Sequence, residues 1–314
     1  MEIIRPDASD TKALCYNYTV TGNIIPAIPN SIKINFFEMT KLAIIGAGGK
    51  MGLRISTNLK NEPFGLSYVE ISEVGKERLA TLKITPQTAD ETVPEADVVI
   101  LAIPDVAIET TAPGIVRMMK PGAMLMTLDP AAPYAGKLPK RSDIAYFVTH
   151  PSHPSVFNWE PSVDAQKDRF GGTMAKQSIV CALMQGEESD YETGEQIARI
   201  MFAPVFRAHR VTVEQMAMLE PGLVETLAST CIYVISEGLK EIIRQGVPAD
   251  AARDFLLGHL NIQMAVLFNE LPGAVFSDAA NKAIARGLAE IFKPDWKKVL
   301  EIDNIKEQIA AITN

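Results

Sequence analysis

Short apolar runs alternate with helical patterns between residues 41 and 210 of the chain. The runs lie far enough apart for a helix to connect each one to the next, which is typical of a parallel sheet covered by helices. The pattern predicts an α/β protein with a doubly wound, mainly parallel sheet and a helix over residues 191–202. The seven predicted strands are residues 41–45, 67–71, 98–103, 124–128, 144–148, 178–184 and 205–208.

After residue 211 the hydrophobic pattern becomes helical, with long amphipathic segments. A helix is predicted to begin at Pro248-Ala249-Asp250, and interruptions are predicted at Gly246 and at Leu271-Pro272-Gly273. We therefore expect an α/β domain over residues 40–210 and an all-helical domain over residues 211–314. Residues 1–39 lack helical periodicity and are interpreted as an extension that need not belong to the natural protein.

The chain has 314 residues, a formal net charge of -8 and a sequence pI of about 5.2. This charge argues against a nucleic-acid partner, which requires a basic face to displace counterions from phosphates. No apolar run approaches the roughly 18 to 20 residues needed to cross a bilayer, so no membrane span is expected. The three cysteines, Cys15, Cys181 and Cys231, form neither a metal-type pair nor a disulfide framework, which favours a cytoplasmic protein.

A glycine-rich segment follows the first predicted strand and leads into a helix predicted to begin near Lys50. In such a loop, bare backbone and the free amides of a helix N-terminus can approach a pyrophosphate. The order of strand, loop and helix predicts a Rossmann-type dinucleotide-binding domain. Its spacing departs from Gly-x-Gly-x-x-Gly, because the last glycine comes one residue late. The predicted cofactor contacts of the loop are Gly46, Gly48, Gly49, Lys50, Met51 and Gly52.

Two carboxylates extend the predicted cofactor site. Glu70 ends the second predicted strand, where it can accept hydrogen bonds from an adenosine ribose, and the next residue is Ile71 rather than an arginine that would pair with a 2′-phosphate. NAD is therefore favoured over NADP; the alternative is a glycine turn that merely packs closely, with Glu70 as a surface side chain. Asp105 follows the third strand and is expected either to contact the nicotinamide ribose or to cap a helix.

The chemical centre is predicted at Thr149-His150-Pro151-Ser152-His153-Pro154, directly after a strand. An imidazole can carry a proton near neutral pH or ligate a metal, and the neighbouring prolines restrict the backbone that presents it. The alternative for both histidines is a loop position without a chemical role.

Two further candidates come from the helical third of the chain. Glu220 lies beside Pro221-Gly222, where an interruption of the helix is expected, and is either a metal ligand or proton acceptor or a solvated glutamate at a helix end. His259, with Asn261, lies within an amphipathic helix and either contacts a polyhydroxy substrate or is a hydrogen-bonded core histidine.

Six short motifs together are similar to those of the D-apionate oxidoisomerase family, within the wider 6-phosphogluconate dehydrogenase-like group. The resemblance runs in order over nearly everything from Met39 onward. The motifs are Gly46-Ala-Gly-Gly-Lys-Met-Gly, Leu128-Asp-Pro-Ala-Ala-Pro-Tyr-Ala-Gly, His150-Pro-Ser-His-Pro, Ala182-Leu-Met-Gln-Gly, Leu219-Glu-Pro-Gly-Leu and Gly258-His-Leu-Asn.

This resemblance implies an NAD-dependent oxidation of the 2-hydroxyl of a branched sugar acid, D-apionate, with a rearrangement of its carbon skeleton to 3-oxo-isoapionate. It also implies a divalent metal ion (Mg, Mn or Zn) between His150 and Glu220, one ligand from each domain, with His153 or His259 as proton carrier. The metal would stabilise negative charge that develops on the ketone and alkoxide oxygens.

Three other functions are weighed against this one. A hydroxyacid or phosphogluconate-like dehydrogenase without isomerisation would present a lysine early in the helical domain, yet none occurs from Val211 to Leu239. A prephenate dehydrogenase-like enzyme shares a His-Pro but needs an aromatic pocket and a cationic clamp that are not evident. A non-catalytic NAD-binding protein is the third. Apolar residues spread around the long helices predict a homodimer.

Overall fold

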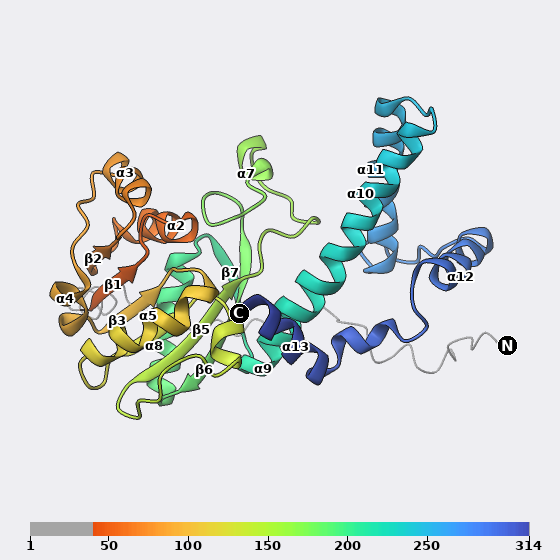
Figure 1. The fold of residues 1–314 in the computed structure, drawn as a ribbon. Coiled ribbons are helices and arrows are strands. Elements are labelled where there is room, and N and C mark those ends of the chain that lie inside the picture. The colour runs from red at the N-terminus through yellow and green to blue at the C-terminus, as the bar shows by residue number, and fades with distance from the viewer. Residues whose placement is uncertain (1–39, 314) are drawn as a thin grey trace.

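The computed structural model describes residues 40–313, so the predicted extension over residues 1–39 lies outside the described residues. A seven-stranded sheet occupies one half of the molecule, and a group of long helices extends away from it (Figure 1). The strands are β1 Lys41–Ile45, β2 Gly65–Val69, β3 Val98–Leu101, β4 Met124–Thr127, β5 Ala145–Pro151, β6 Gln177–Gln185 and β7 Val205–Arg210.

The strand order is β2-β1-β3-β4-β5-β6-β7, and every neighbouring pair is parallel except β5 with β6. All seven predicted strands are present, and the prediction of a doubly wound, mainly parallel sheet is confirmed. The helices of this half are α2 Lys50–Leu59, α3 Glu73–Thr81, α4 Ala89–Thr92, η2 Val93–Glu95, α5 Asp105–Met118, α6 Ala131–Tyr134, α7 Val163–Lys167 and α8 Glu188–Met201.

Helices cover both faces of the sheet because successive strand side chains point to opposite faces. In β1, Leu42 and Ile44 belong to one apolar cluster, which also contains buried side chains of α2 and α8. Ala43 and Ile45 belong to a second cluster, with buried side chains of α5. Both faces of the central strands are therefore buried, which explains why the sequences of those strands are continuous apolar runs.

Strand β5 is longer than the sequence predicted, and this changes the position of His150. The predicted strand ended at residue 148, but β5 continues to Pro151 because the antiparallel strand β6 pairs with it, with His150 opposite Val180. His150 therefore lies within a strand, and the expectation that it lies in a loop was wrong. His153 does lie in the loop that follows.

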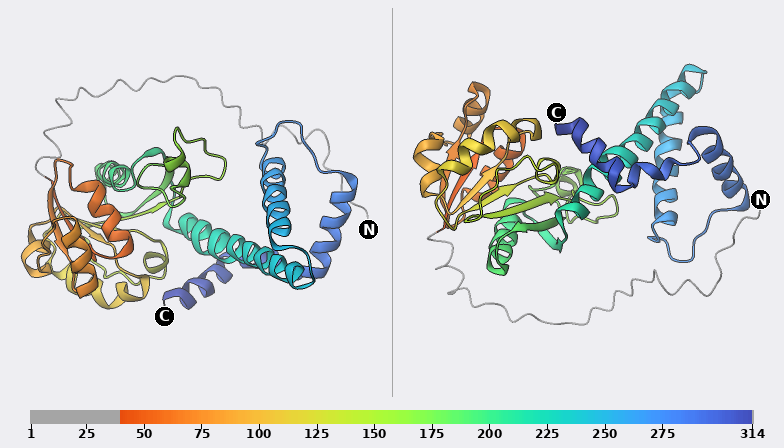
Figure 2. Two further views of the ribbon diagram at one scale, coloured as in Figure 1. Left: turned by 90° about the horizontal axis from the view of Figure 1, so that it is seen from above. Right: turned by 60° about the horizontal axis from the view of Figure 1, so that its bottom comes forward.

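The last third of the described chain is helical, as predicted, and the helix predicted at Pro248-Ala249-Asp250 begins at Ala249. Figures 1 and 2 show α10, α11 and α12 standing clear of the sheet, whereas the final helix returns to it. The elements are α9 Val213–Ala217, η3 Met218–Ala228, α10 Ser229–Arg244, α11 Ala249–Leu267, α12 Asp278–Ile291, η4 Trp296–Leu300 and α13 Ile302–Thr313.

The predicted interruption at Pro221-Gly222 was wrong, because the helix continues through it as a π-helix, η3. Proline ends an α-helix by lacking an N–H and by crowding the carbonyl four residues earlier. The wider i→i+5 register relieves that conflict, and at its end the Ser229 N–H donates to the carbonyl of Val224. A continuous helix thus runs from Val213 to Arg244.

This continuous helix bears on the expectation that no membrane span occurs but does not overturn it, because a single helix that meets the test of length and composition is weak evidence. With 32 residues and an apolar window of mean hydropathy 1.2, it is long and apolar enough to cross a membrane by length and composition, and only 11% of that window is buried. The same helix carries Glu220 and Glu225 in its π-helical part.

Helix α13 fastens the start of the helical region to the sheet half. Its Ile305 and Ile309 pack with Ala131 of α6 and Ala217 of α9 in a small buried cluster. A Cβ on Gly222 would lie 3.0 Å from Ile305, so a small residue lets α13 approach η3 closely. The π-helix is therefore packed on α9 and α13, whereas α10 continues away from it and packs on α11.

Substitution of Gly52 tests the close packing of α2 on the glycine loop. A Cβ at Gly52 would lie 2.1 Å from the backbone oxygen of Gly46, so Gly52→Ala is expected to lower the free energy of unfolding by roughly 2 to 3 kcal/mol. Urea denaturation measures this. The matched control is Gly114→Ala in α5, where no atom lies within 4 Å, and which should stabilise by about 0.5 to 1 kcal/mol. Equal effects of the two substitutions would contradict the packing argument.

Candidate active site

The candidate groups converge because parallel strands bring their carboxyl ends to one edge of the sheet. The glycine loop follows β1, Asp105 comes shortly after β3, Asp129 shortly after β4, and His150 lies near the end of β5. Glu220 reaches the same edge from η3. A site assembled at this edge draws on both halves of the molecule.

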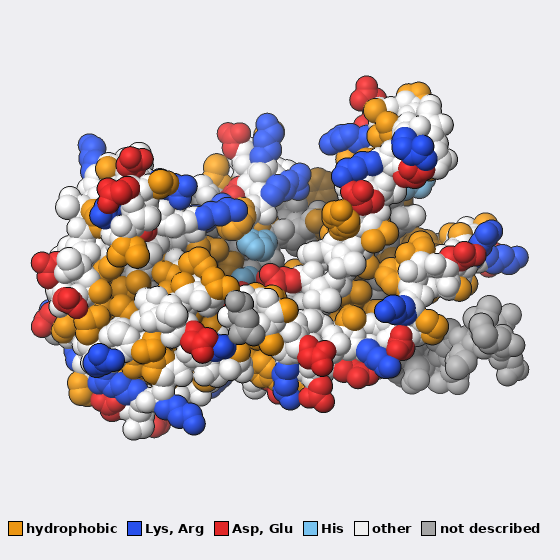
Figure 3. Space-filling model, viewed as in Figure 1, with side chains coloured by type: hydrophobic (Ala, Val, Ile, Leu, Met, Phe, Trp, Pro, Cys, Tyr) orange, Lys and Arg blue, Asp and Glu red, His pale blue; other side chains and the backbone are white. Residues whose placement is uncertain are grey.

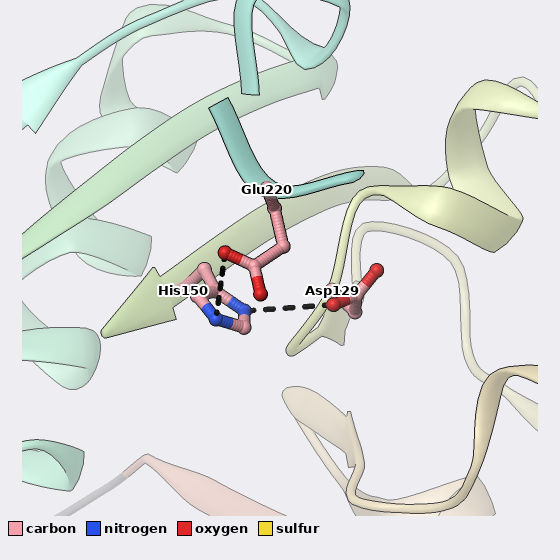
Figure 4. Close-up of side chains that lie close together, drawn as sticks. All are labelled: Asp129, His150 and Glu220. Atoms are coloured by element: carbon pink, nitrogen blue, oxygen red, sulfur yellow. Dashed lines mark ion pairs between the residues drawn. The ribbon is translucent and has the colours of Figure 1, made fainter. Parts of the chain in front are cut away.

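Asp129, His150 and Glu220 form the centre of the site (Figure 4). Each offers a ligand atom within 4.8 Å of the others. The His150 Nε2 lies 3.5 Å from Glu220 Oε2, and its Nδ1 lies 3.6 Å from Asp129 Oδ2. All three side chains are partly buried, and the backbone N–H of Ala131 holds Asp129 by donating to its Oδ1 at 2.8 Å. This donor set fits a divalent cation.

A hydrogen bond fixes the proton of His150. Its Nδ1 lies 2.8 Å from the carbonyl oxygen of Leu128, which can only accept, so Nδ1 carries the proton. The lone pair then lies on Nε2, the atom that faces Glu220. An imidazole oriented in this way by a backbone carbonyl is common among metal-ligating histidines.

Two more carboxylates, Asp105 and Glu225, surround this centre. Burial raises the pKa of Asp105 to about 6, with a further contribution from Asp129, and its Oδ1 is buried without a hydrogen-bond partner. Burial also raises the pKa of Glu225, and the charges of Glu220 and Asp129 add to it. Among the described residues, no lysine or arginine is among the groups that shift either pKa. The centre therefore carries excess negative charge, which a divalent cation would offset.

His153 lies beside the centre in a constrained backbone conformation. Its φ is 58°, a left-handed value that is uncommon for residues other than glycine, and its ring centroid lies 6.4 Å from that of His150. Its Nδ1 lies 2.8 Å from the carbonyl oxygen of Phe170, so Nδ1 is the protonated nitrogen and Nε2 is free to accept a proton. Backbone strain of this kind is characteristic of functional sites.

The glycine loop has the features that a dinucleotide requires. Gly46 has a φ of +79°, and α2 begins after Gly49 without any side chain capping its first amides. Those N–H groups have no intrahelical partner and suit an anion. Glu70 accepts hydrogen bonds from the backbone N–H groups of Gly48 and Ser72, at 2.9 and 2.8 Å. Burial alone would raise the pKa of Glu70, but these hydrogen bonds outweigh it and lower the pKa.

Phe170 connects the glycine-loop helix to His153. The Arg54 guanidinium lies 3.6 Å from the centroid of its ring and Lys50 Nζ lies 5.3 Å from it, while the His153 ring meets its edge at 4.8 Å. The first turns of α2 and the histidine loop are thus packed on one aromatic side chain.

His259 lies apart from these groups. It belongs to α11, which packs against α10 and stands away from the sheet in Figures 1 and 2. The alternative of a core histidine is also wrong for the single chain, because His259 is exposed; it stacks on Phe255 with ring centroids 4.1 Å apart. Within one chain the structure therefore brings together His150, His153 and Glu220, but not His259.

Sequence reasoning did not select Asp129 or Glu225 as site residues. Asp129 follows the carboxyl end of β4, a position that the strand pattern could have supplied. Glu225 stands five residues after Glu220, and this spacing places two side chains near each other only in a π-helix, where the repeat is i→i+5. No pattern in the sequence predicts the π-helical register.

Fold and site together define a dinucleotide-binding oxidoreductase of the Rossmann type with a helical C-terminal region. Residues 158–313 match the model of the phosphogluconate dehydrogenase (decarboxylating) C-terminal family. The chain is 54% identical to the D-apionate oxidoisomerase of Rhizobium rhizogenes, over 88% of this chain and 100% of the relative. It is 51% identical to that of Cupriavidus necator, over 87% of this chain and 99% of the relative. The chain belongs to the D-apionate oxidoisomerase family, which confirms the predicted family.

Solved structures agree with this membership. The crystal structure of a semialdehyde dehydrogenase NAD-binding protein from Cupriavidus necator, in complex with calcium and NAD, superposes with a TM-score of 0.85 at 51% identity, covering 87% of this chain and 99% of that one. An NADH-preferring ketol-acid reductoisomerase from an uncultured archaean, 16% identical over 90% of this chain and 84% of that one, has a TM-score of 0.63 and shares the fold. The predicted class, an NAD-dependent oxidoreductase, is confirmed.

Replacement of Asp105 tests the charge of the centre. The pKa of Asp105 is about 6 in the folded protein against 3.8 for the ordinary group, so folding binds protons between these values and stability falls as pH rises through them. Without divalent cations, Asp105→Asn should be more stable than the parent by about 1 to 2 kcal/mol at pH above 7, after allowance for solvent screening, and no different below pH about 4.

Thermal unfolding at a series of pH values in the presence of a chelator measures this difference. The matched control is Glu77→Gln, an exposed carboxylate of α3 outside the site, whose stability should follow that of the parent at every pH. A pH-independent effect of Asp105→Asn would contradict the argument.

Proposed function

We propose that this protein is a D-apionate oxidoisomerase that oxidises the 2-hydroxyl of D-apionate with NAD and rearranges the carbon skeleton to 3-oxo-isoapionate. The observation that carries the proposal is the Asp129–His150–Glu220 centre. It lies at the same sheet edge as the glycine loop, and no side chain caps the first amides of helix α2 that follows this loop. The family of the chain and the names of its relatives supply the substrate.

The glycine loop and Glu70 would hold the cofactor. The first amides of α2 suit the pyrophosphate, and the Glu70 carboxylate suits the ribose hydroxyls. Ile71 follows Glu70 where an arginine would pair with a 2′-phosphate, although Arg78 donates to the Gly48 carbonyl at 3.4 Å in the same loop. Bound NAD supplies the acceptor for the hydride from C2. Asp105 is proposed to lie near the nicotinamide ribose, between the loop and the centre.

Asp129, His150 and Glu220 would hold a divalent cation (Mg, Mn or Zn), and the calcium of the structure from Cupriavidus necator favours a cation in this family. When bound, such an ion supplies a Lewis acid that stabilises negative charge on the ketone and alkoxide oxygens of the substrate. Of the chain's own groups, the Leu128 carbonyl keeps the Nε2 lone pair of His150 available, and the Ala131 amide keeps Asp129 in place.

The chemistry needs a base at the 2-hydroxyl. We assign this role to His153, whose Nε2 is free and whose ring is fixed by Phe170. In the first step C2 loses a hydride to NAD and its hydroxyl proton to His153, forming a ketone. In the second step the C3 hydroxyl loses its proton, a one-carbon substituent migrates with its bonding electrons from C3 to C2, C3 becomes the ketone and the C2 oxygen regains a proton.

A decarboxylating dehydrogenase is the second candidate, because the matched C-terminal family carries that name. Such chemistry would use a lysine at the start of the helical region, but the helix that bears Glu220 has no lysine before Lys240. The acidic centre instead favours the isomerising reaction. The protein is further proposed to be cytoplasmic, which agrees with two unpaired cysteines, Cys181 and Cys231, in the described chain, and to be a homodimer.

The activity prediction concerns the Asp129–His150–Glu220 centre. With D-apionate and NAD, the protein should form NADH, and this turnover should fall at least about a hundredfold in Glu220→Gln and in His150→Asn, because each removes a ligand and leaves the other acidic groups uncompensated. A chelator should have the same effect on the parent, and Mg, Mn or Zn should reverse it. NADH absorbance with D-apionate, 6-phosphogluconate and other aldonates measures the specificity.

Glu195→Gln serves as the control, because this carboxylate pairs with Arg199 on α8, outside the acidic centre. It should keep the parent's activity. Full turnover by metal-free protein would remove the metal from the proposal, and release of carbon dioxide from the substrate would favour the decarboxylating alternative.

The cofactor prediction concerns Glu70. Glu70→Ala should raise the KM for NAD about tenfold or more, because hydrogen bonds to a charged carboxylate contribute about 1.5 to 3 kcal/mol, while kcat changes little. Steady-state kinetics with varied NAD measures it. Glu73→Ala, two residues beyond Ile71 and exposed, is the control. An unchanged KM for NAD in Glu70→Ala would show that Glu70 only organises the loop.

A further inference from the structure

The loop between β5 and β6, which carries α7, is tied to the glycine-loop helix α2 through two backbone carbonyls. Arg54 Nη1 donates to the carbonyl oxygen of Gly171 at 2.6 Å. One turn later on α2, Asn58 Nδ2 donates to the carbonyl oxygen of Gly172 at 3.0 Å. In Figure 3, histidine side chains lie just below this loop. The end of the loop is therefore fixed by α2, above the histidines.

Asp168 keeps the same end of the loop folded. Its carboxylate accepts hydrogen bonds from the backbone N–H groups of Gly171, Met174 and Ala175, at 3.0, 2.8 and 3.1 Å. Burial alone would raise the pKa of Asp168, but these hydrogen bonds and the charge of Arg54 outweigh it and lower the pKa. The ionised carboxylate and the Arg54 guanidinium thus hold one short backbone segment from two sides.

Phe170 lies in this segment and contacts both Arg54 and His153. The guanidinium carbon of Arg54 lies 3.6 Å from the centroid of the Phe170 ring, a cation–π contact. The same ring meets that of His153 at 4.8 Å, and the Phe170 carbonyl oxygen lies 2.8 Å from His153 Nδ1. Arg54 therefore holds both the side chain of Phe170 and, through Gly171, the peptide that follows it.

The conformation of His153 depends on such support. Its φ of 58° is left-handed, and strained backbone of this kind persists only where the surrounding structure over-determines it. The tautomer of an imidazole follows from the hydrogen bonds of its two nitrogens. If the Phe170 carbonyl moved away, the proton of His153 would be free to move to Nε2, and Nε2 could then no longer accept one.

We propose that Arg54 is a positioning residue for His153. By holding Phe170 and Gly171, it keeps the Phe170 carbonyl on His153 Nδ1 and leaves the Nε2 lone pair available as the base. The role of His153 as base rests on the proposed function, whereas the control of its tautomer by Arg54 does not. Because Arg54 lies on α2, a single helix places both the cofactor loop and the base.

Steady-state kinetics test the consequence for turnover. In Arg54→Ala, kcat with D-apionate should fall about tenfold to a hundredfold, because the base is misplaced, while the KM for NAD changes less than about twofold. Guanidinium ion, far below the concentrations that unfold proteins, should restore part of this kcat. Arg54→Lys should lose kcat as well, since an ammonium group lacks the planar face that covers Phe170.

Arg141→Ala is the matched control. Arg141 also donates to a backbone carbonyl, that of Met119 at 2.7 Å, but it lies between α6 and the start of β5, outside the site. Its loss should leave kcat at the parent's value, and guanidinium ion should not increase it.

A second readout needs no turnover. Long-range proton–nitrogen NMR spectra of histidine-labelled protein distinguish the two tautomers of each of the four histidines. The His153 signals are identified by their loss in His153→Gln. Above pH about 7, where the imidazole is neutral, His153 should carry its proton on Nδ1 in the parent and in Arg141→Ala. In Arg54→Ala and Arg54→Lys the proton should move toward Nε2.

Three results would overturn the proposal. They are an unchanged His153 tautomer in both Arg54 variants, equal losses of kcat in Arg54→Ala and Arg141→Ala, or a raised KM for NAD at the parent's kcat, which would make Arg54 a cofactor ligand instead. A parent protein that turns over no acid, but whose His153 tautomer changes in the Arg54 variants, would reject the proposed function and keep Arg54 as the positioning residue.

Discussion

Uncompensated negative charge at the carboxyl edge of the sheet is the constraint on which the rest of this structure depends. Asp105, Asp129, Glu220 and Glu225 gather around one imidazole, and burial together with mutual repulsion raises the pKa of Asp105 and Glu225. Protein packing alone does not favour such a cluster, because each buried charge without a partner is costly. A bound cation turns the same arrangement into a stabilising one, so metal binding and stability are coupled.

The π-helix is the structural device that completes this centre. An α-helix with Pro221 in its interior would end or bend there, and its 3.6-residue repeat would turn Glu225 away from Glu220. In the wider register both carboxylates face the sheet edge, and Pro221 and Gly222 are buried against α13. One irregular segment therefore attaches the helical region to the sheet and supplies the site with two acidic groups.

The sequence predicted the fold well because its signals are local. The alternation of apolar runs and helices found all seven strands, and the strand-loop-helix order found the glycine loop. Features that depend on distant partners were missed: β5 runs on to His150 and Pro151 only because β6 pairs with it, and the helix continues through Pro221 only because it adopts a different register. Likewise His150, His153 and Glu220 came from motifs, whereas Glu225 becomes a neighbour of Glu220 only in three dimensions.

The environment of His259 also depends on partners that are distant in the sequence. A motif selected this residue, yet in one chain it stands on a helix that packs against α10 and leaves its apolar side in water. The conflict disappears if the environment of α11 is another copy of the chain, because apolar burial then explains Phe255 and Ile262 while an acceptor nitrogen among them needs a polar counterpart.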